Sequence, residues 1–203
     1  MPRRVDHAER RGHLVVALLR VAARHGLHAV TMRSVAAEAG VSLRLVQYYF
    51  DTKAELLLAA LRQLEQQSSQ RWAARVAALP QDTDPRAVVE AFLAEALPTD
   101  GASRDFHLVW TSYAVLAMTD PDLAAQPFVD GPRRLETHLA DILRRAQDQG
   151  RLPAGREPAA EATRLLALTH GLGTSLLVGH HSVDTARDAV TYHLDQLFTE
   201  VER

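Results

Sequence analysis

The sequence predicts an all-α protein of about nine helices. Apolar residues recur at three- and four-residue spacing along most of the 203-residue chain, and no segment shows the strict alternation of a half-buried strand. A short N-terminal segment, TMRSVAAEAGVSLRLVQYYFDTK over residues 31–53, also has the layout of two short helices joined by a tight turn. We therefore expect a three-helix head over residues 1–51 and a larger helical body over residues 52–203.

The head begins with a helix over about residues 5–25, which Gly26 ends. Thr31 is placed to cap the next helix, and Gly40 stands where the chain must leave that helix in a left-handed conformation. Ser42 then caps a short helix over Leu43–Tyr49. This is the layout of a helix-turn-helix, whose second helix enters the major groove of DNA.

The distribution of charge agrees with that interpretation. Up to Lys53 there are nine basic and four acidic residues, a net charge of +5, whereas the remaining 14 basic and 21 acidic residues give −7. A basic head suits contact with phosphates, and an acidic body keeps the rest of the surface away from the duplex. The alternative is a three-helix packing module with a charged, solvated face.

The body is expected to consist of helices separated by proline and glycine. Thr52 and Glu55 have the spacing of a capping box and begin a helix that can continue to Leu79. Asp120 followed by Pro121 indicates another helix start, although Pro127, Gly131 and Pro132 should kink or interrupt the early part of that helix. The remaining expected helices cover residues 86–97, 104–119, 120–149, 157–179 and 183–201.

The N-terminal fifty residues resemble the TetR family of bacterial transcription regulators. The residues that carry the resemblance are Thr31-Met32-Arg33, Val35-Ala36, Ala39-Gly40-Val41-Ser42, Tyr48-Tyr49-Phe50, Thr52-Lys53 and Glu55-Leu56. Stretches of the C-terminal half are similar to the BetI-type subgroup, namely Leu108-Val109-Trp110, Thr119-Asp120-Pro121-Asp122-Leu123, Gly150-Arg151-Leu152 and Gly171-Leu172. The resemblance implies a homodimer with DNA-binding heads and a ligand-responsive body, most often a repressor that a small molecule releases from a palindromic operator.

Several residues of the head are candidates for contact with double-stranded DNA. Arg44 suits base readout, because a guanidinium can bond O6 and N7 of guanine together, and Leu43 could meet a thymine methyl. Tyr48 and Tyr49 are adjacent and cannot share a face, although both contact DNA by the resemblance. Gln47 stands where many family members have a tyrosine that touches a phosphate. The expected phosphate contacts are Thr31, Arg33, Ser42 and Lys53, with simple helix capping as the alternative for Thr31 and Ser42.

The last two expected helices are candidates for a subunit interface. The helix over residues 157–179 contains LLALTHGLGTSLLVG, which is apolar around nearly its whole circumference, and Gly171, Gly173 and Ser175 would permit close approach of a partner. Residues 183–201 supply one apolar stripe. We expect a homodimer through these two helices, because a lone head buries too little surface for tight operator binding. The alternative is that both helices form the core of a monomer.

A small-molecule effector is expected in the body. Phe106, Trp110 and Tyr113 fall on one side of their helix, and Trp72 can face them, so that the cluster could hold a planar or cationic ligand. Core packing is the alternative for each aromatic residue. His170 is either a ligand hydrogen-bonding group or a satisfied interface histidine. No cofactor and no metal site is expected, because the histidines lack partners at metal-ligand spacing.

Other function classes lack support in the sequence. There is no cysteine, Gly-rich phosphate loop, HExxH or GxSxG motif, and no apolar run reaches the roughly 18 residues of a membrane span. The polar N-terminus is not that of a secretory signal, which predicts a soluble, cytoplasmic protein. We expect a regulator and not an enzyme. The alternatives are a helical DNA- or partner-binding regulator without a small-molecule ligand, or an all-helical enzyme.

Overall fold

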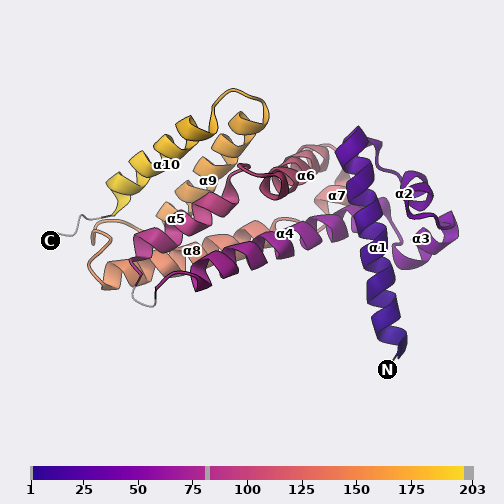
Figure 1. The fold of residues 1–203 in the computed structure, drawn as a ribbon, viewed down its shortest axis with the longest axis horizontal. Helices are drawn as coiled ribbons and strands as arrows, with labels where there is room; N and C mark the ends of the chain where they lie inside the picture. The colour runs from indigo at the N-terminus through magenta and orange to yellow at the C-terminus, as the bar shows by residue number, and fades with distance from the viewer. Residues whose placement is uncertain (1, 81–82, 199–203) are drawn as a thin grey trace. The chain divides into compact units, whose positions relative to one another are not determined.

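The computed structural model describes residues 2–80 and 83–198, with side chains described from residue 7 onward, and it is helical throughout (Figure 1). No strand occurs in the described ranges, which confirms the all-α prediction. None of the described helices combines the length and apolar character needed to cross a bilayer. The elements are α1 (Pro2–His25), the 3-10 turn η1 (Leu27–Ala29), α2 (Met32–Ala39), α3 (Leu43–Tyr49), α4 (Lys53–Ala77), α5 (Pro85–Ala96), α6 (Gly101–Ala117), α7 (Pro121–Ala124), α8 (Asp130–Asp148), α9 (Pro158–Leu177) and α10 (Val183–Leu197).

The chain divides into two compact units. The head unit holds the chain up to Gln66 together with Leu108–Phe128, and the body unit holds Gln67–His107 and the chain from Val129 onward. The long helices α4 and α6 therefore each contribute residues to both units. The expected boundary near residue 51 stays a prediction.

Local sequence determines the helix ends of the DNA-binding motif. The Thr31 hydroxyl accepts a hydrogen bond from the Ser34 amide at 3.0 Å, and Gly40 adopts a left-handed conformation with φ of 66°. The Ser42 hydroxyl accepts from the Leu45 amide at 3.2 Å. Both predicted caps and the predicted glycine turn are thereby confirmed. Helix α1 packs against η1 and α2, and α2 packs against α3.

The start of α4 shows a variant of the predicted capping box. The Glu55 amide donates to the Thr52 hydroxyl at 3.1 Å, as expected. The Glu55 carboxylate, however, accepts from the Asp51 amide, also at 3.1 Å, and not from the amide of the capping residue. The amides of Asp51 and Glu55 are therefore both satisfied by side chains at the start of α4.

The body unit is built around one apolar core. Helix α8 packs against α5 and α9, and α10 packs against α9. Polar contacts tie the surface elements together: the Arg86 guanidinium pairs with Asp195 at 2.6 Å, and Arg156 donates to the Gln196 carbonyl at 2.8 Å. The largest fully buried core side chains are Leu93, Leu139, Leu143, Leu152 and Leu165.

The interruption expected early in the helix over residues 120–149 is confirmed, because the segment is divided into α7 and α8 with Pro127 in the connection. Pro132 does not break α8, because it lies in the first turn, where its missing N–H costs nothing. One predicted helix start differs from the structure. Helix α6 begins at Gly101 and not at residue 104. The reason is a cap that we overlooked, in which the Asp100 carboxylate accepts from the Ser103 amide at 2.8 Å.

Candidate nucleic-acid interface and ligand cavities

The recognition helix α3 has one face in the head core and the other in solvent. Val46 is fully buried and fixes the inner face. Arg44, Gln47 and Tyr48 are exposed, and the Tyr48 side chain is 71 % accessible. Helix α3 therefore offers a guanidinium, an amide and a phenol to a partner, and these are the groups that read base edges or contact phosphates in a major groove.

The two adjacent tyrosines have opposite environments. Tyr49 is only 9 % accessible, and its ring centroid lies 4.6 Å from the His7 ring and 5.1 Å from the Tyr48 ring. Tyr49 thus belongs to the head core, and Tyr48 is the one that can offer a whole ring to DNA. Leu43 is half-buried.

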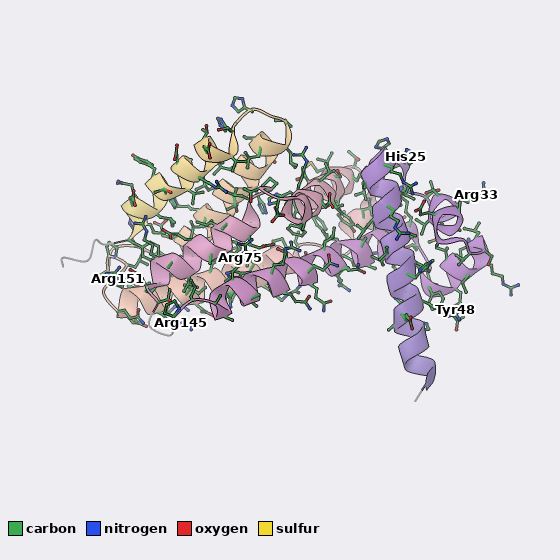
Figure 2. All side chains as sticks on the ribbon, in the orientation of Figure 1. His25, Arg33, Tyr48, Arg75, Arg145 and Arg151 are labelled. Atoms are coloured by element: carbon green, nitrogen blue, oxygen red, sulfur yellow. The ribbon has the colours of Figure 1, made fainter. Side chains whose placement is uncertain are left out.

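The predicted phosphate contacts lie at helix starts. Thr31 and Arg33 stand at the start of α2, Ser42 precedes α3, and Lys53 begins α4, and all four side chains are exposed. The free N–H groups and the dipole of a helix N-terminus favour an anion at such positions. Figure 2 labels Arg33 and Tyr48, which extend outward from α2 and α3.

One residue that the sequence analysis missed braces the recognition helix. Arg11, on α1, donates from Nη1 to the Tyr49 carbonyl at 2.6 Å, and its guanidinium carbon lies 4.2 Å from the centre of the Phe50 ring. The bond satisfies a carbonyl at the C-terminal end of α3, and the cation–π contact adds to it. The sequence signal that indicates this role is the spacing of Arg11 from Leu14 and Leu18, which places Arg11 on the inner face of α1.

Three of the predicted ligand residues come together in the body unit. Trp72, Phe106 and His170 line one enclosed cavity of about 70 Å³. Trp110 and Tyr113 are not among the residues that line it, and both belong to the head unit. Tyr113 is fully buried, its hydroxyl donates to the Leu123 carbonyl at 3.4 Å, and burial raises its pKa to about 12. For Tyr113 the structure therefore favours the core-packing alternative.

The enclosed cavity contains a buried carboxylate that the sequence analysis did not single out. Glu95 is 3 % accessible, and one of its oxygens accepts from Arg71 at 2.7 Å and from the Ser68 hydroxyl at 3.2 Å. Arg75 lies 3.5 Å from the other oxygen. A buried charge is tolerated only when it is paired, so Glu95 is a neutralised group and not a free anion.

His107, which also lines this cavity, packs closely against Gly173. His107 is buried and its Nε2 bonds the Ala96 carbonyl. A Cβ atom added at Gly173 would lie 2.7 Å from the His107 ring. Gly173, which we expected to face a partner subunit, thus makes room for His107 inside the protomer. Burial lowers the pKa of His107, and burial together with the charge of His107 lowers the pKa of His170.

These lowered pKa values predict a fall of stability in mild acid. The unfolded chain takes up protons on His107 and His170 below their ordinary pKa of about 6.5, and the folded protein does not, so folding stability is complete above that pH and is lost as the pH falls below it. We expect the Tm to fall between pH 7.5 and pH 5.5, and His107→Gln to reduce that slope. His25→Gln, at an exposed position, supplies the matched substitution against which the slope of His107→Gln is compared. An equal slope in both variants would contradict the assignment to His107.

A larger groove lies next to the enclosed cavity, with Ser69 and Trp72 lining both. Its volume is about 650 Å³, and its walls come from α4, the start of α5 and α8. Trp72 packs edge-on against the rings of Phe92, at 5.6 Å, and His138, at 4.9 Å. The remaining lining residues are Ala73, Val76, Ala77, Thr83, Pro85, Val88, Ile142, Arg145 and Gln149.

Comparison with known proteins agrees with a DNA-binding head followed by a helical body. Residues 14–60 match the family described as bacterial regulatory proteins, tetR family, and residues 85–199 match the C-terminal part of BetI-type transcriptional repressors. The chain belongs to the TetR family. It is a transcriptional regulator with a BetI-type C-terminal region, and this confirms the resemblance of its motifs.

Individual TetR-family relatives align over most of the chain. The HTH-type transcriptional regulator PksA of Bacillus subtilis is 27% identical over 100% of this chain and 97% of its own length. The HTH-type transcriptional regulator BetI of Agrobacterium fabrum is 32% identical over 83% of this chain and 80% of its own. A transcriptional regulator from Saccharomonospora viridis, solved in complex with choline, is 28% identical, covers 95% of this chain and 100% of its own, and superposes with a TM-score of 0.82.

Proposed function

We propose that this TetR-family regulator is a cytoplasmic homodimer that represses transcription from a palindromic operator and is released by a small molecule bound in the body unit. The observation that carries the proposal is the outer face of α3, where Arg44, Gln47 and Tyr48 are exposed on a basic head. Arg44 reads a base, Gln47 and Tyr48 contact the backbone or a thymine methyl, and Thr31, Arg33, Ser42 and Lys53 hold phosphates.

The dimer contact is proposed for α9 and α10. Val178, which ends α9, is 73 % accessible, and Tyr192 on α10 is 70 % accessible. A Cβ atom added at Gly171 would meet nothing within 4 Å, so the packing of the protomer does not require glycine there. Glycine inside a helix costs about 1 kcal/mol relative to alanine, and the close approach of a second subunit would offset that cost.

The proposed switch is a shift between two populations. Helix α4 contributes to both units, so that a ligand bound beside Trp72 can favour one arrangement of α4 over another. The ligand acts only through its different affinities for the DNA-binding and the released arrangement. The alternative, a regulator without a small-molecule ligand, predicts no thermal stabilisation by any member of a metabolite panel.

Selection of bound fragments from genomic DNA tests the DNA-binding role. We expect enriched fragments to contain an inverted repeat whose half-site centres are about 34–36 Å apart, one turn of the duplex. Affinity for such a fragment should fall steeply as salt is raised from 50 to about 200 mM, because bound phosphates release counterions. A protein that shows no preference for any fragment over bulk competitor duplex would overturn the proposal.

A further inference from the structure

The two cavities beside Trp72 offer different chemistry to a ligand. The enclosed cavity, at about 70 Å³, is far smaller than the roughly 300–1,000 Å³ that small-molecule sites occupy. Its carboxylate, Glu95, is held by Arg71 at 2.7 Å and approached by Arg75 at 3.5 Å. A small cation that entered it would meet a carboxylate whose charge Arg71 and Arg75 already balance, so this cavity does not favour a ligand such as the choline seen in the Saccharomonospora relative.

The groove has the size and the walls of a ligand site. Its volume of about 650 Å³ lies within the roughly 300–1,000 Å³ that small-molecule sites occupy. Most of its lining side chains are apolar, namely Trp72, Ala73, Val76, Ala77, Pro85, Val88 and Ile142. Such walls stabilise an extended apolar body by about 25 cal/mol for each Å² that is removed from water.

Arg145 is the one arginine among the described residues that line the groove. Its Nε donates to the Asp141 carbonyl at 3.2 Å, and no carboxylate of the described residues pairs with its guanidinium. The neighbouring Arg144, by contrast, is paired with the Asp141 carboxylate at 2.6 Å. Both Nη groups of Arg145, which Figure 2 labels on α8, are thus left for a planar anion that can accept two parallel bonds.

The indole of Trp72 contributes its apolar ring to the wall of the groove. Its Nε1 atom is buried and has no acceptor among the described residues. A buried donor without a partner costs about 1–3 kcal/mol, so this indole position is held by the packing around it. The groove therefore presents the guanidinium of Arg145 on apolar walls, and its described lining includes no aspartate or glutamate.

We propose that the groove binds an amphipathic carboxylate, with the carboxylate at Arg145 and the apolar body along Trp72, Val76 and Ile142. The inference rests on the proposed function, because it names the chemical class of the effector. It also separates this chain from its choline-bound relative, since an apolar anion and not a small cation is the recognised species.

A matched series of probes tests the charge and the apolar body separately. Dodecanoate, dodecanol, dodecyltrimethylammonium and choline are titrated below their aggregation concentrations into the full-length protein, with the Trp110→Phe background leaving Trp72 as the only fluorescent tryptophan. We expect dodecanoate to bind about tenfold more tightly than dodecanol, which corresponds to about 1.4 kcal/mol for an exposed charge-assisted contact. The two cations should bind more weakly than either. Choline binding more tightly than dodecanoate would overturn the inference.

Single substitutions test whether the carboxylate binds at Arg145. Arg145→Gln should abolish the preference for the acid over the alcohol, and Arg144→Gln should leave it unchanged because Arg144 does not line the groove. Ala73→Phe, at an exposed helical position, should weaken both probes by filling the groove, with the Tm as a check on folding. If the protein binds its operator but binds dodecanoate and dodecanol equally, this inference is overturned and the proposed function is not. If the protein binds the carboxylate but prefers no DNA sequence over bulk competitor duplex, the proposed function is overturned and the inference is supported.

Discussion

Replacement of Arg44 by alanine is expected to cause the largest loss of operator affinity of any single change in the head. Arg44 is exposed in the first turn of α3, where it can form two bonds with one guanine. Such a contact discriminates by about 1–3 kcal/mol, and a homodimer loses it at both half-sites, so the total is about 2–6 kcal/mol. The measurement is the ratio of affinities for the selected operator and for a scrambled duplex at fixed salt.

Arg33 provides the matched control for Arg44. It is equally exposed but lies at the start of α2, where a phosphate contact is expected. Arg33→Ala should weaken operator and scrambled duplex alike and should reduce the salt slope by about one for each head. Unchanged operator affinity in Arg44→Ala would remove Arg44 from base readout, and a dimer that remains intact would show that the loss is local.

The two glycines of α9 should respond in opposite ways to a larger side chain. Gly173→Ala places a Cβ atom 2.7 Å from the buried His107 ring, and such overpacking costs about 1–3 kcal/mol. For a chain of this size the Tm should fall by about 2–12 °C. Gly171→Leu meets open space in the protomer and should leave the Tm of the protomer unchanged or higher, while it separates the subunits.

Sedimentation velocity and operator titration test the expected effect of Gly171→Leu on the subunit contact. Gly171→Leu is expected to be monomeric where the parent protein is dimeric and to lose tight operator binding, because one head buries too little surface. Gly173→Ala should keep the dimer at temperatures where it is folded. A dimeric Gly171→Leu protein would place the subunit contact elsewhere than this face of α9.

The head could be predicted closely because its determinants are local. Thr31, Gly40 and Ser42 each act within four residues, through a cap or a left-handed turn. The sequence left open which of Tyr48 and Tyr49 faces solvent. That choice depends on packing against α1, which is distant in sequence and supplies His7 at 4.6 Å from the Tyr49 ring and Arg11 at the Tyr49 carbonyl.

The body could be predicted less well because its site depends on contacts between helices. Helical spacing shows that Phe106, Trp110 and Tyr113 share a face, but it does not show that Phe106 lines a cavity while Tyr113 packs in the other unit. Glu95 was missed for the same reason, since its partner Arg71 is 24 residues away. The late start assigned to α6 was an avoidable error, because the Asp100–Ser103 cap is local.

The brace that Arg11 forms has a consequence for how this regulator can be switched. One guanidinium joins the end of α3 to α1 by a bond of 2.6 Å and by its stacking on Phe50, and both contacts oppose an independent pivot of α3 against α1. In the proposed switch, an effector is therefore expected to displace each head as a whole. Substitution of Arg11 is expected to reduce the ratio of affinities for operator and unrelated duplex and to leave effector affinity unchanged.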